Sequence, residues 1–338
     1  MKVLVNGIGN IGTTLLALLI EHRELLGIDV VFALKNKPLP WQVDDLNYLS
    51  SLGVHICSRV QESDYEFLDS IIDEVDYIFD CTNNGGGMKN KQWYVDLPNL
   101  KGACAQGSEK KFGVSYMTGV NDEAIRKKKF VHVVSCNTHS LASLLTTFTG
   151  GNLEQHTESD FVVVRRSEDI GNHQRLVSAN VVARHLDEQI GTHHSVDVID
   201  LFATKKMLPS LTSSDVTTPS QLMHAVRFNI GLSDKLSKEQ VLQCIANNPY
   251  MASSTKFDSN VIFERGRRIG FQGRIYSHAI VIENNLIISR KSIKGWAFSP
   301  QEGNTLLSTI NAFLIQTNSA STEKIMTTLR EQLLMKRW

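Results

Sequence analysis

The run Gly7-Ile8-Gly9-Asn10-Ile11-Gly12 constrains the fold of this 338-residue chain more than any other stretch. It follows an apolar strand pattern, Lys2–Asn6, and leads into a helical pattern of apolar residues that begins at Leu15. In such a turn the first glycine allows the sharp reversal, the second lets the backbone approach a pyrophosphate, and the third lets helix and strand pack closely. The pyrophosphate then lies at the helix N-terminus. The run predicts a Rossmann-type dinucleotide-binding domain, a turn without a ligand being the alternative. The expected cofactor-binding residues are Gly7, Gly9, Asn10, Ile11 and Gly12.

The end of the second strand pattern, 29–34, bears on the choice of cofactor. An NAD site commonly has an acidic residue at this point, which holds the ribose 2′-hydroxyl. This chain has Lys35-Asn36-Lys37 instead, and an amine attracts the 2′-phosphate that a carboxylate repels. We therefore expect NADP slightly in preference to NAD, with Lys35 at the cofactor; a pair of solvated loop lysines is the alternative. Gly107 and Ser108 follow another strand pattern, 102–105, and are expected at the cofactor because open α/β sheets bind ligands at the carboxyl ends of their strands.

The stretch Val134-Ser135-Cys136-Asn137-Thr138-His139 joins a strand pattern, 130–134, to a helical pattern that includes Leu141, Leu144 and Phe148. A cysteine at the start of a helix lies near its positive end, where the thiolate is stabilised over the thiol. The alternative is a buried core cysteine, which is the commoner role of a lone thiol. Because Cys136 follows a strand of the same sheet as the cofactor loops, we favour a nucleophile.

The second half of the chain has strand patterns with alternating residues. One of them, 160–166, ends in Arg165-Arg166, and another, 223–230, places His224, Val226, Phe228 and Ile230 on one face. His193-His194 precedes a further strand-like segment, and 277–282 and 286–289 are expected to form a hairpin. We therefore predict an α/β protein in which a Rossmann-type parallel-sheet domain, 1–135 with the helical tail 300–338, adjoins an α+β catalytic domain, 136–299, with a largely antiparallel sheet.

Composition and charge narrow the class of protein. The 35 basic and 35 acidic residues give a formal net charge of zero, which argues against nucleic acid or an acidic membrane surface as the partner. The five cysteines are widely spaced without a C-x-x-C pair, which is typical of a reduced, cytosolic protein rather than a disulfide framework or a zinc site. The sequence begins directly with a strand pattern, so we expect no signal peptide, and it contains no apolar run long enough to span a membrane. We expect a soluble cytoplasmic protein that holds no metal.

Several stretches, taken in order, carry a resemblance that covers nearly the whole chain. They are Asn6-Gly7-x-Gly9-x-Ile11-Gly12, Gln106-Gly107-Ser108-Glu109-Lys110, Val133-Val134-Ser135-Cys136-Asn137-Thr138, Val164-Arg165-Arg166, His193-His194-x-x-Asp197-Val198 and Leu222-Met223-His224. Each motif is weak alone, but the ordered set resembles the archaeal-type (class II) glyceraldehyde-3-phosphate dehydrogenases. The resemblance implies a Rossmann domain completed by the C-terminal helix, an inserted catalytic domain and a homotetramer.

The resemblance also implies a chemistry: NAD(P)-dependent oxidation of D-glyceraldehyde 3-phosphate to 1,3-bisphosphoglycerate, or the reverse. Cys136 matches the nucleophile, which forms a thiohemiacetal and then a thioester that inorganic phosphate cleaves, and His224 matches the general base. The expected substrate-binding residues are Ser135, Asn137, Thr138, Arg165, His193 and His194, and Arg166 is expected at the cofactor. Arginines and histidines suit anionic phosphates, although a histidine pair alone also fits a metal site or a loop.

Departures from the resemblance leave alternatives open. His139 stands where the family has a threonine that helps to bind phosphate, although an imidazole could substitute for it. Asn83 replaces a proline, Ser108 replaces a glycine, and the segment at Glu283 lacks a histidine near the nicotinamide. The alternatives are a dehydrogenase of another phosphorylated aldehyde or of a semialdehyde, and a catalytically retired NADP-binding regulator. Retention of both Cys136 and His224 argues against the regulator.

Overall fold

The chain forms two compact units in a computed structural model that describes residues 1–61, 64–107, 109–167, 185–219, 222–300 and 302–338. Unit 1 consists of Met1–Thr118, Asp122–Val134 and Leu306–Thr327. Unit 2 consists of Gly119–Asn121, Ser135–Thr305 and Thr328–Trp338. The predicted α/β class is confirmed, with a parallel sheet in unit 1 and a largely antiparallel sheet in unit 2. The predicted limits of the two domains, 1–135 with 300–338 and 136–299, remain a prediction.

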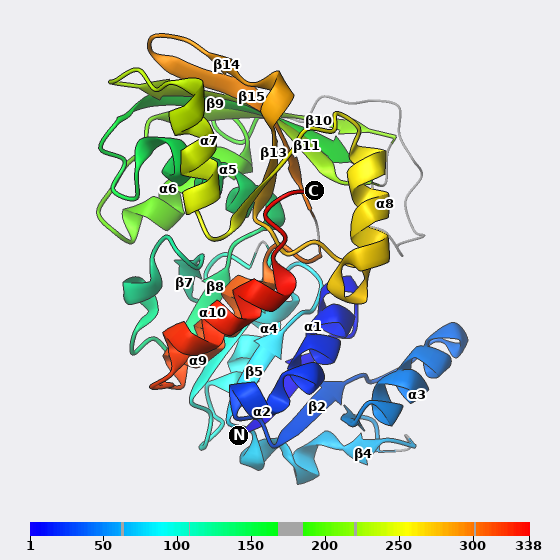
Figure 1. The fold of residues 1–338 in the computed structure, drawn as a ribbon. Coiled ribbons are helices and arrows are strands. Elements are labelled where there is room, and N and C mark those ends of the chain that lie inside the picture. The colour runs from blue at the N-terminus through cyan, green and yellow to red at the C-terminus, as the bar shows by residue number, and fades with distance from the viewer. Residues whose placement is uncertain (62–63, 108, 168–184, 220–221, 301) are drawn as a thin grey trace. The chain divides into compact units, whose positions relative to one another are not determined.

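The sheet of unit 1 is parallel throughout, with the strand order β4-β3-β2-β1-β5-β6-β8-β7 (Figure 1). Its strands are β1 (Lys2–Asn6), β2 (Val30–Leu34), β3 (Val54–Ser58), β4 (Glu66–Phe67), β5 (Tyr77–Asp80), β6 (Gly102–Gln106), β7 (Val114–Tyr116) and β8 (Phe130–Val133). β1 lies between β2 and β5, so the chain order reverses at β1. In an open parallel sheet, this reversal point is where a ligand binds at the carboxyl ends of the strands.

The helices of unit 1 bury apolar faces on this sheet. The described α-helices are α1 (Asn10–Glu21), α2 (Arg23–Leu26), α3 (Val43–Ser51), α4 (Gly86–Tyr94) and α9 (Leu306–Gln316), with 3-10 turns at Pro40–Gln42, Leu68–Ser70, Ile72–Glu74 and Asp122–Ile125. The apolar residues from Leu15 to Leu19 are buried, as the helical pattern predicts. α9, red in Figure 1, packs on β6 although about 200 residues separate the two in sequence. Gln316 at its end accepts a 2.6 Å hydrogen bond from the Tyr77 hydroxyl.

Unit 2 contains a mixed sheet with the order β10-β9-β11-β15-β13-β12, and β14 pairs with β15 at its side. Its strands are β9 (His156–Arg166), β10 (Leu211–Thr218), β11 (His224–Leu232), β12 (Met251–Ser254), β13 (Ala279–Ile282), β14 (Ile287–Ile288) and β15 (Ser292–Ser299). The pairs β9–β10 and β12–β13 are parallel, and the others are antiparallel. The alternation predicted for β11 is confirmed, because every second residue from His224 to Ile230 is buried.

Two local predictions for unit 2 are wrong. The segments 277–282 and 286–289 do not form a hairpin: β13 pairs with β12 and β15, β14 pairs with β15, and a 3-10 turn, Glu283–Asn285, separates them. The segment after His193-His194 is not a strand but a helix, α6 (His193–Ala203). Val198, Leu201 and Phe202 are buried at a helical spacing of three and four, and this periodicity outweighs the strand preference of the β-branched residues.

The remaining described helices belong wholly or partly to unit 2. They are α5 (Cys136–Thr149), α7 (Lys238–Asn247) and α8 (Ser259–Ile269), with 3-10 turns at Phe271–Gly273 and Glu283–Asn285, and α10 (Thr322–Leu333) precedes the C-terminus. Trp338 is buried in a cluster with Ile262 and Ile280, and its backbone N–H donates to the Ser253 carbonyl at 2.9 Å. Among the described helices, none combines the length and the apolar character that crossing a membrane requires.

Candidate active site

The N-terminus of α1 in unit 1 is shaped by its glycines. Gly7 has φ +104°, and a Cβ there would lie 2.8 Å from the carbonyl of Cys81 at the end of β5. A Cβ at Gly12 would lie 2.0 Å from the Gly7 oxygen, whereas a Cβ at Gly9 would meet no atom within 4 Å. No side-chain hydrogen bond caps this helix, and its first turn contains no acidic residue. Two glycines are therefore required by packing, while Gly9 faces open space beside an uncapped helix N-terminus, which fits a bound pyrophosphate.

The other residues expected at the cofactor are distributed over both units. Lys35 follows β2 in unit 1, and partial burial lowers the pKa of its amine. Gly107 follows β6 with φ +82°, and its carbonyl lies 2.5 Å from Nε2 of His132. Ser108 lies outside the described residues. Arg166 belongs to unit 2, at the end of β9.

A second helix N-terminus in unit 1 is closed by the protein itself. The buried carboxylate of Glu109 accepts hydrogen bonds from the backbone N–H groups of Gly85 and, at 3.0 Å, Met88 at the start of α4. Nearby, the carboxylate of Asp80 accepts the Tyr94 hydroxyl at 2.6 Å and the Asn90 amide at 2.9 Å. Sequence reasoning did not single out either acid. The charge of Glu109 takes the place that a ligand anion takes at an uncapped helix.

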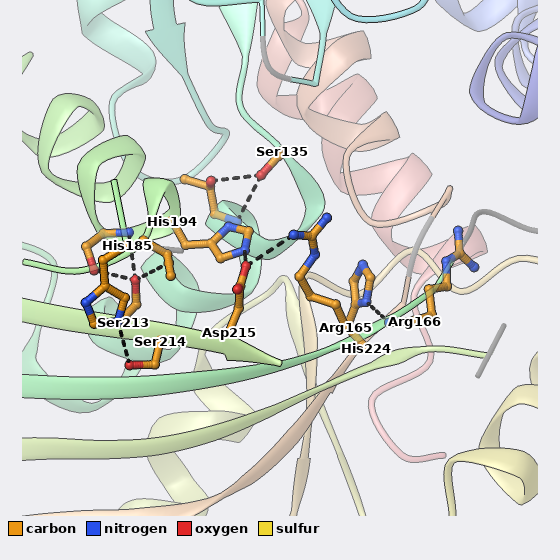
Figure 2. Close-up of polar contacts among 12 residues, drawn as sticks. Ser135, Arg165, Arg166, His185, His194, Ser213, Ser214, Asp215 and His224 are labelled. Atoms are coloured by element: carbon orange, nitrogen blue, oxygen red, sulfur yellow. Dashed lines mark hydrogen bonds and ion pairs between the residues drawn. The ribbon is translucent and has the colours of Figure 1, made fainter. Parts of the chain in front are cut away.

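Cys136 is the first residue of α5, as the predicted strand-to-helix corner requires. Ser135 is the N-cap: its hydroxyl accepts the Thr138 backbone N–H at 3.4 Å and lies 2.9 Å from the Thr138 hydroxyl (Figure 2). Cys136 is partly exposed, whereas Asn137 and Thr138 are buried. The thiol therefore stands at the positive end of a capped helix, which favours its thiolate.

Three side chains hold the backbone carbonyl of Cys136. It accepts hydrogen bonds from the Ser140 hydroxyl at 3.2 Å, the Ser299 hydroxyl at 3.3 Å and the Asn304 amide at 3.0 Å. Ser299 lies directly opposite His224 in the register of β11 and β15. This pairing brings the histidine strand to the cysteine corner, and the three donors fix the backbone that carries the thiol. Sequence reasoning missed Ser299 and Asn304 because they lie more than 160 positions from Cys136.

His224 is a buried, neutral histidine. Its Nδ1 accepts the backbone N–H of Arg166 at 3.0 Å. Burial, reinforced by the positive charges of Arg166 and Arg165, lowers the pKa of its imidazole well below the ordinary value. Because Nδ1 accepts a hydrogen bond, the neutral ring has its proton on Nε2. His224 is thus arranged to donate a hydrogen bond from Nε2.

The structure brings Arg165 and His194 together around Asp215, a residue of β10 that sequence reasoning missed (Figure 2). The Asp215 carboxylate lies 3.2 Å from Nη1 of Arg165 and 3.5 Å from Nε2 of His194. Burial alone would raise the pKa of Asp215, but the contacts with His194 and Arg165 outweigh it and lower the pKa. Burial and the neighbouring His194 lower the pKa of His193 to about 4. The predicted anion-binding group therefore includes an ionised carboxylate; its sequence signal was an acidic residue on the buried face of an alternating strand.

Arg166 is paired within unit 2. Its side chain, 2% exposed, forms an ion pair with the buried carboxylate of Glu302. Arg274 lies 3.6 Å from the same carboxylate, and these three residues line a small cavity with Met223 and Phe263. Two cations around one buried acid form a compact network that fixes the chain beyond β15. Sequence reasoning missed Glu302.

His139 is fully buried rather than directed to solvent. Its Nδ1 lies 3.0 Å from the Ser135 carbonyl, and its ring contacts His278 edge-on with a centroid distance of 5.0 Å. His278 stacks on Tyr250, and its Nδ1 lies 2.8 Å from the Ser143 hydroxyl. His139 therefore belongs to the packing beneath α5. Asn137 differs, since its buried Oδ1 has no hydrogen-bond partner among the described residues.

Comparison with known proteins gives relatives over most of the chain. The glyceraldehyde-3-phosphate dehydrogenase of Sulfolobus acidocaldarius is 25% identical over 310 residues, which cover 87% of this chain and 85% of the relative. The enzymes of the same name from Metallosphaera sedula and Saccharolobus islandicus are 26% and 27% identical, over 85% and 78% of this chain and 84% and 76% of their own. No protein-family model matches the chain.

Proposed function

The chain is a distant relative of the archaeal glyceraldehyde-3-phosphate dehydrogenases, and on this basis we propose that it is an NAD(P)-dependent phosphorylating aldehyde dehydrogenase. Its substrate would be D-glyceraldehyde 3-phosphate, oxidised to 1,3-bisphosphoglycerate or formed in reverse. The single observation that carries the proposal is the fixed position of Cys136, at the N-terminus of α5 with its carbonyl held by three side chains. A buried structural thiol has no need of such an arrangement.

Cys136 acts first as the nucleophile. Its thiolate attacks the aldehyde carbon, so that a C–S bond forms and the carbonyl electron pair moves to oxygen. The resulting thiohemiacetal alkoxide needs hydrogen-bond donors. Backbone N–H groups at the start of α5 and the Asn137 amide group supply them from the same corner.

His224 supplies a further donor rather than a base in this step. The hydrogen bond from Arg166 leaves the imidazole proton on Nε2, which can donate to the alkoxide. The family resemblance assigns general-base chemistry to this position, which needs the opposite tautomer. An alkoxide that is already deprotonated needs no base when it loses hydride, so the donor role is chemically sufficient.

The cofactor and phosphate complete the cycle. The oxidised nicotinamide of a bound cofactor would supply the hydride acceptor, and loss of hydride from the thiohemiacetal carbon leaves a thioester on Cys136. Inorganic phosphate then attacks the thioester, the C–S bond breaks, and the thiolate leaves with the acyl phosphate as product. The uncapped N-terminus of α1 and the open space at Gly9 support a dinucleotide in unit 1. Lys35 supports NADP slightly over NAD.

The anionic end of the substrate is assigned to Arg165, His193 and His194, with Ser135 and Thr138 beside Cys136. Arg165 is 37% exposed, so its guanidinium can reach an incoming phosphate while one N–H stays near Asp215. A phosphorylated aldehyde uses several such polar groups, whereas a semialdehyde carboxylate needs fewer. We further propose a cytoplasmic protein that forms a homotetramer. Light scattering of the purified protein would test the oligomeric state.

An absorbance assay on the wild-type protein and two cysteine variants tests the function. Purified protein is mixed with D-glyceraldehyde 3-phosphate, inorganic phosphate and either NADP or NAD, and reduced nicotinamide is followed by absorbance. We expect turnover that Cys136→Ser abolishes and that the matched thiol variant Cys244→Ser, on α7, leaves intact. Turnover that survives Cys136→Ser would refute the nucleophile. Tight NADP binding without turnover of any phosphorylated aldehyde or semialdehyde would identify a regulator instead.

The cofactor preference is tested separately. Lys35→Asp places a carboxylate where a 2′-phosphate would lie, and we expect the ratio of NADP to NAD turnover to fall. An unchanged ratio would show that Lys35 is a solvated loop residue.

A further inference from the structure

The cluster of His193, His194 and Asp215 has more ligand atoms than its internal contacts use. His193 and His194 begin α6, and Asp215 lies on the buried face of β10. One ligand atom from each of the three residues lies within 4.8 Å of the others. Among the residues that the structure describes, it is the only group of three or more histidine, cysteine or acidic side chains whose ligand atoms lie this close together. We propose that His193, His194 and Asp215 bind a divalent transition-metal ion, with Zn²⁺ as the best fit.

Burial without hydrogen bonds is the first argument. His194 and Asp215 are each 2% exposed. Nδ1 of His194 and Oδ1 of Asp215 lack a hydrogen-bond partner among the described residues, and Nε2 of His194 has only the 3.5 Å contact with Oδ2 of Asp215. A buried polar atom without a partner destabilises the folded protein, and here two such atoms meet at one place. A bound cation would satisfy them together.

The spacing of the ligand atoms is the second argument. Nε2 of His194 and Oδ2 of Asp215 are 3.5 Å apart, and two ligands of a tetrahedral zinc ion at about 2.0–2.1 Å are separated by roughly 3.3 Å. The widest separation in the cluster, up to 4.8 Å, must shorten by up to about 1.5 Å on binding. Rotation of the partly exposed His193 ring provides this closure. The adjacent rings have centroids 3.9 Å apart, so both imidazoles already converge.

The ligand chemistry is the third argument. Two imidazole nitrogens and one carboxylate oxygen form a donor set that zinc prefers, and three protein ligands leave a fourth position open. Arg165 contacts Oδ2 of Asp215 at 3.2 Å and thereby orients the carboxylate, as outer partners of metal ligands commonly do. Sulfur ligands are not among the three, which disfavours a soft ion such as Cu(I).

Charge gives the site a purpose. Without an ion, the carboxylate of Asp215 offsets the positive charge of Arg165, so the group is a weak receptor for a phosphate dianion. A divalent ion would raise the net charge of the group by two and present an open coordination position beside Arg165. This consequence, unlike the metal binding itself, rests on the proposed function, because it assumes that the substrate phosphate binds there.

Metal content and binding test the inference directly. Tag-free protein is stripped with a chelator, dialysed and titrated with Zn²⁺ and with Co²⁺, whose visible absorption reports tetrahedral coordination. We expect about one equivalent to bind, with a tetrahedral Co²⁺ spectrum. His193→Asn and Asp215→Asn should weaken binding at least ~100-fold, as loss of one ligand exceeds the loss of an outer partner. His193 is partly exposed, so its variant keeps the test valid if Asp215→Asn does not fold; circular dichroism monitors both.

Two controls separate the outcomes. His185→Asn removes a neighbouring imidazole that lies 3.4 Å from the Ser214 hydroxyl but outside the cluster, and it should bind metal normally (Figure 2). Cys136→Ser should also bind normally, which excludes the thiol as the ligand. Failure to bind one equivalent, or binding that His193→Asn and Asp215→Asn leave unchanged, would overturn the metal site. Dehydrogenase turnover in protein that binds no metal would refute the metal site but leave the proposed function standing. Metal binding without turnover would support the metal site and contradict the proposed function.

Discussion

The helices α1 and α5 both follow a parallel strand at a tight corner, but their N-termini are capped differently. Each follows a parallel strand, β1 or β8, and each begins at a tight corner. Gly9 precedes α1 and offers no side chain, so no side chain caps the first turn. Ser135 precedes α5 and caps it through Thr138. Every helix start has backbone N–H groups without intrahelical partners; α1 offers them no side-chain acceptor, whereas α5 has its own cap and places a thiol there.

The difference suits the two roles that we propose for these helices. A bound pyrophosphate needs close backbone approach and must not compete with a built-in acceptor. A nucleophile needs a fixed backbone and a positive potential, which a cap and the three donors to the Cys136 carbonyl provide. α4 marks the third outcome, since Glu109 fills its N-terminus with the protein's own carboxylate.

The largest expected effect concerns the residue that adjoins the α5 corner. His224→Gln keeps a side-chain N–H donor but removes the imidazole base, and His224→Leu removes both. If His224 acts as a donor, turnover should fall by about 10³-fold in His224→Leu and by only about tenfold in His224→Gln. Steady-state kinetics of the two variants measure this. Equal losses in both variants would show that His224 acts as a general base and not as a hydrogen-bond donor.

The next effect separates the glycines of the α1 corner. Gly12→Ala forces a Cβ to within 2.0 Å of the Gly7 oxygen and should lower the free energy of unfolding by about 3 kcal/mol. Gly9→Ala meets no atom within 4 Å, so it should leave thermal stability unchanged and weaken only cofactor binding. Calorimetry for stability and fluorescence titration with NADP for binding distinguish the two. Normal NADP affinity in Gly9→Ala would show that the pyrophosphate does not bind at the N-terminus of α1.

A pH effect should follow from the histidines that α5 packs on. Burial lowers the pKa of His224 and of His278 in the folded protein, whereas both rings titrate near 6.5 when unfolded. The unfolded chain therefore binds more protons below pH ~6.5, and stability is present above that pH and lost as the pH falls through it. The loss reaches at most about 1.4 kcal/mol per pH unit for each histidine.

Thermal denaturation between pH 7.5 and 5.5, in the presence of a chelator, measures this loss. His278→Gln, which keeps a polar side chain beside Ser143, should flatten the pH dependence by one histidine's share. An unchanged slope would mean that His278 is not buried in its neutral form.

The smallest effect tests the cap of α5. Ser135→Ala removes the acceptor for the Thr138 N–H and should lower the free energy of unfolding by about 1 kcal/mol. Ser135→Asp keeps an acceptor and should restore most of that stability. If the cap positions Cys136, turnover in Ser135→Ala should fall more than stability alone explains, with normal NADP binding. Unchanged turnover would reduce Ser135 to a structural cap.

The features predictable from sequence were those set by neighbours along the chain. The glycine run, the alternation of β11 and the cysteine at the start of α5 each follow from local spacing, and the structure has all three. Asp215, Ser299 and Asn304 were not found in this way, because their contacts with Arg165 and with Cys136 span 50 or more positions and depend on how strands pair.

Strand pairing and helix periodicity account for the errors. The predicted hairpin at 277–289 failed because β13 finds better partners in β12 and β15, which a local turn signal cannot reveal. The helix at His193 was missed because its β-branched residues resemble a strand, while the buried spacing of Val198, Leu201 and Phe202 is helical. That helix, packed against α5, aligns His193 and His194 with Asp215.

The most direct test of the account is to trap the covalent intermediate on α5. Protein is mixed with D-glyceraldehyde 3-phosphate and NADP in the absence of inorganic phosphate, quenched in acid, and examined by intact and peptide mass spectrometry. We predict one acyl group per chain, attached to Cys136, with one equivalent of reduced cofactor formed in the same burst. An acyl group on another residue, or a burst of reduced cofactor with no adduct on Cys136, would contradict the assignment of this helix N-terminus as the site of the nucleophile.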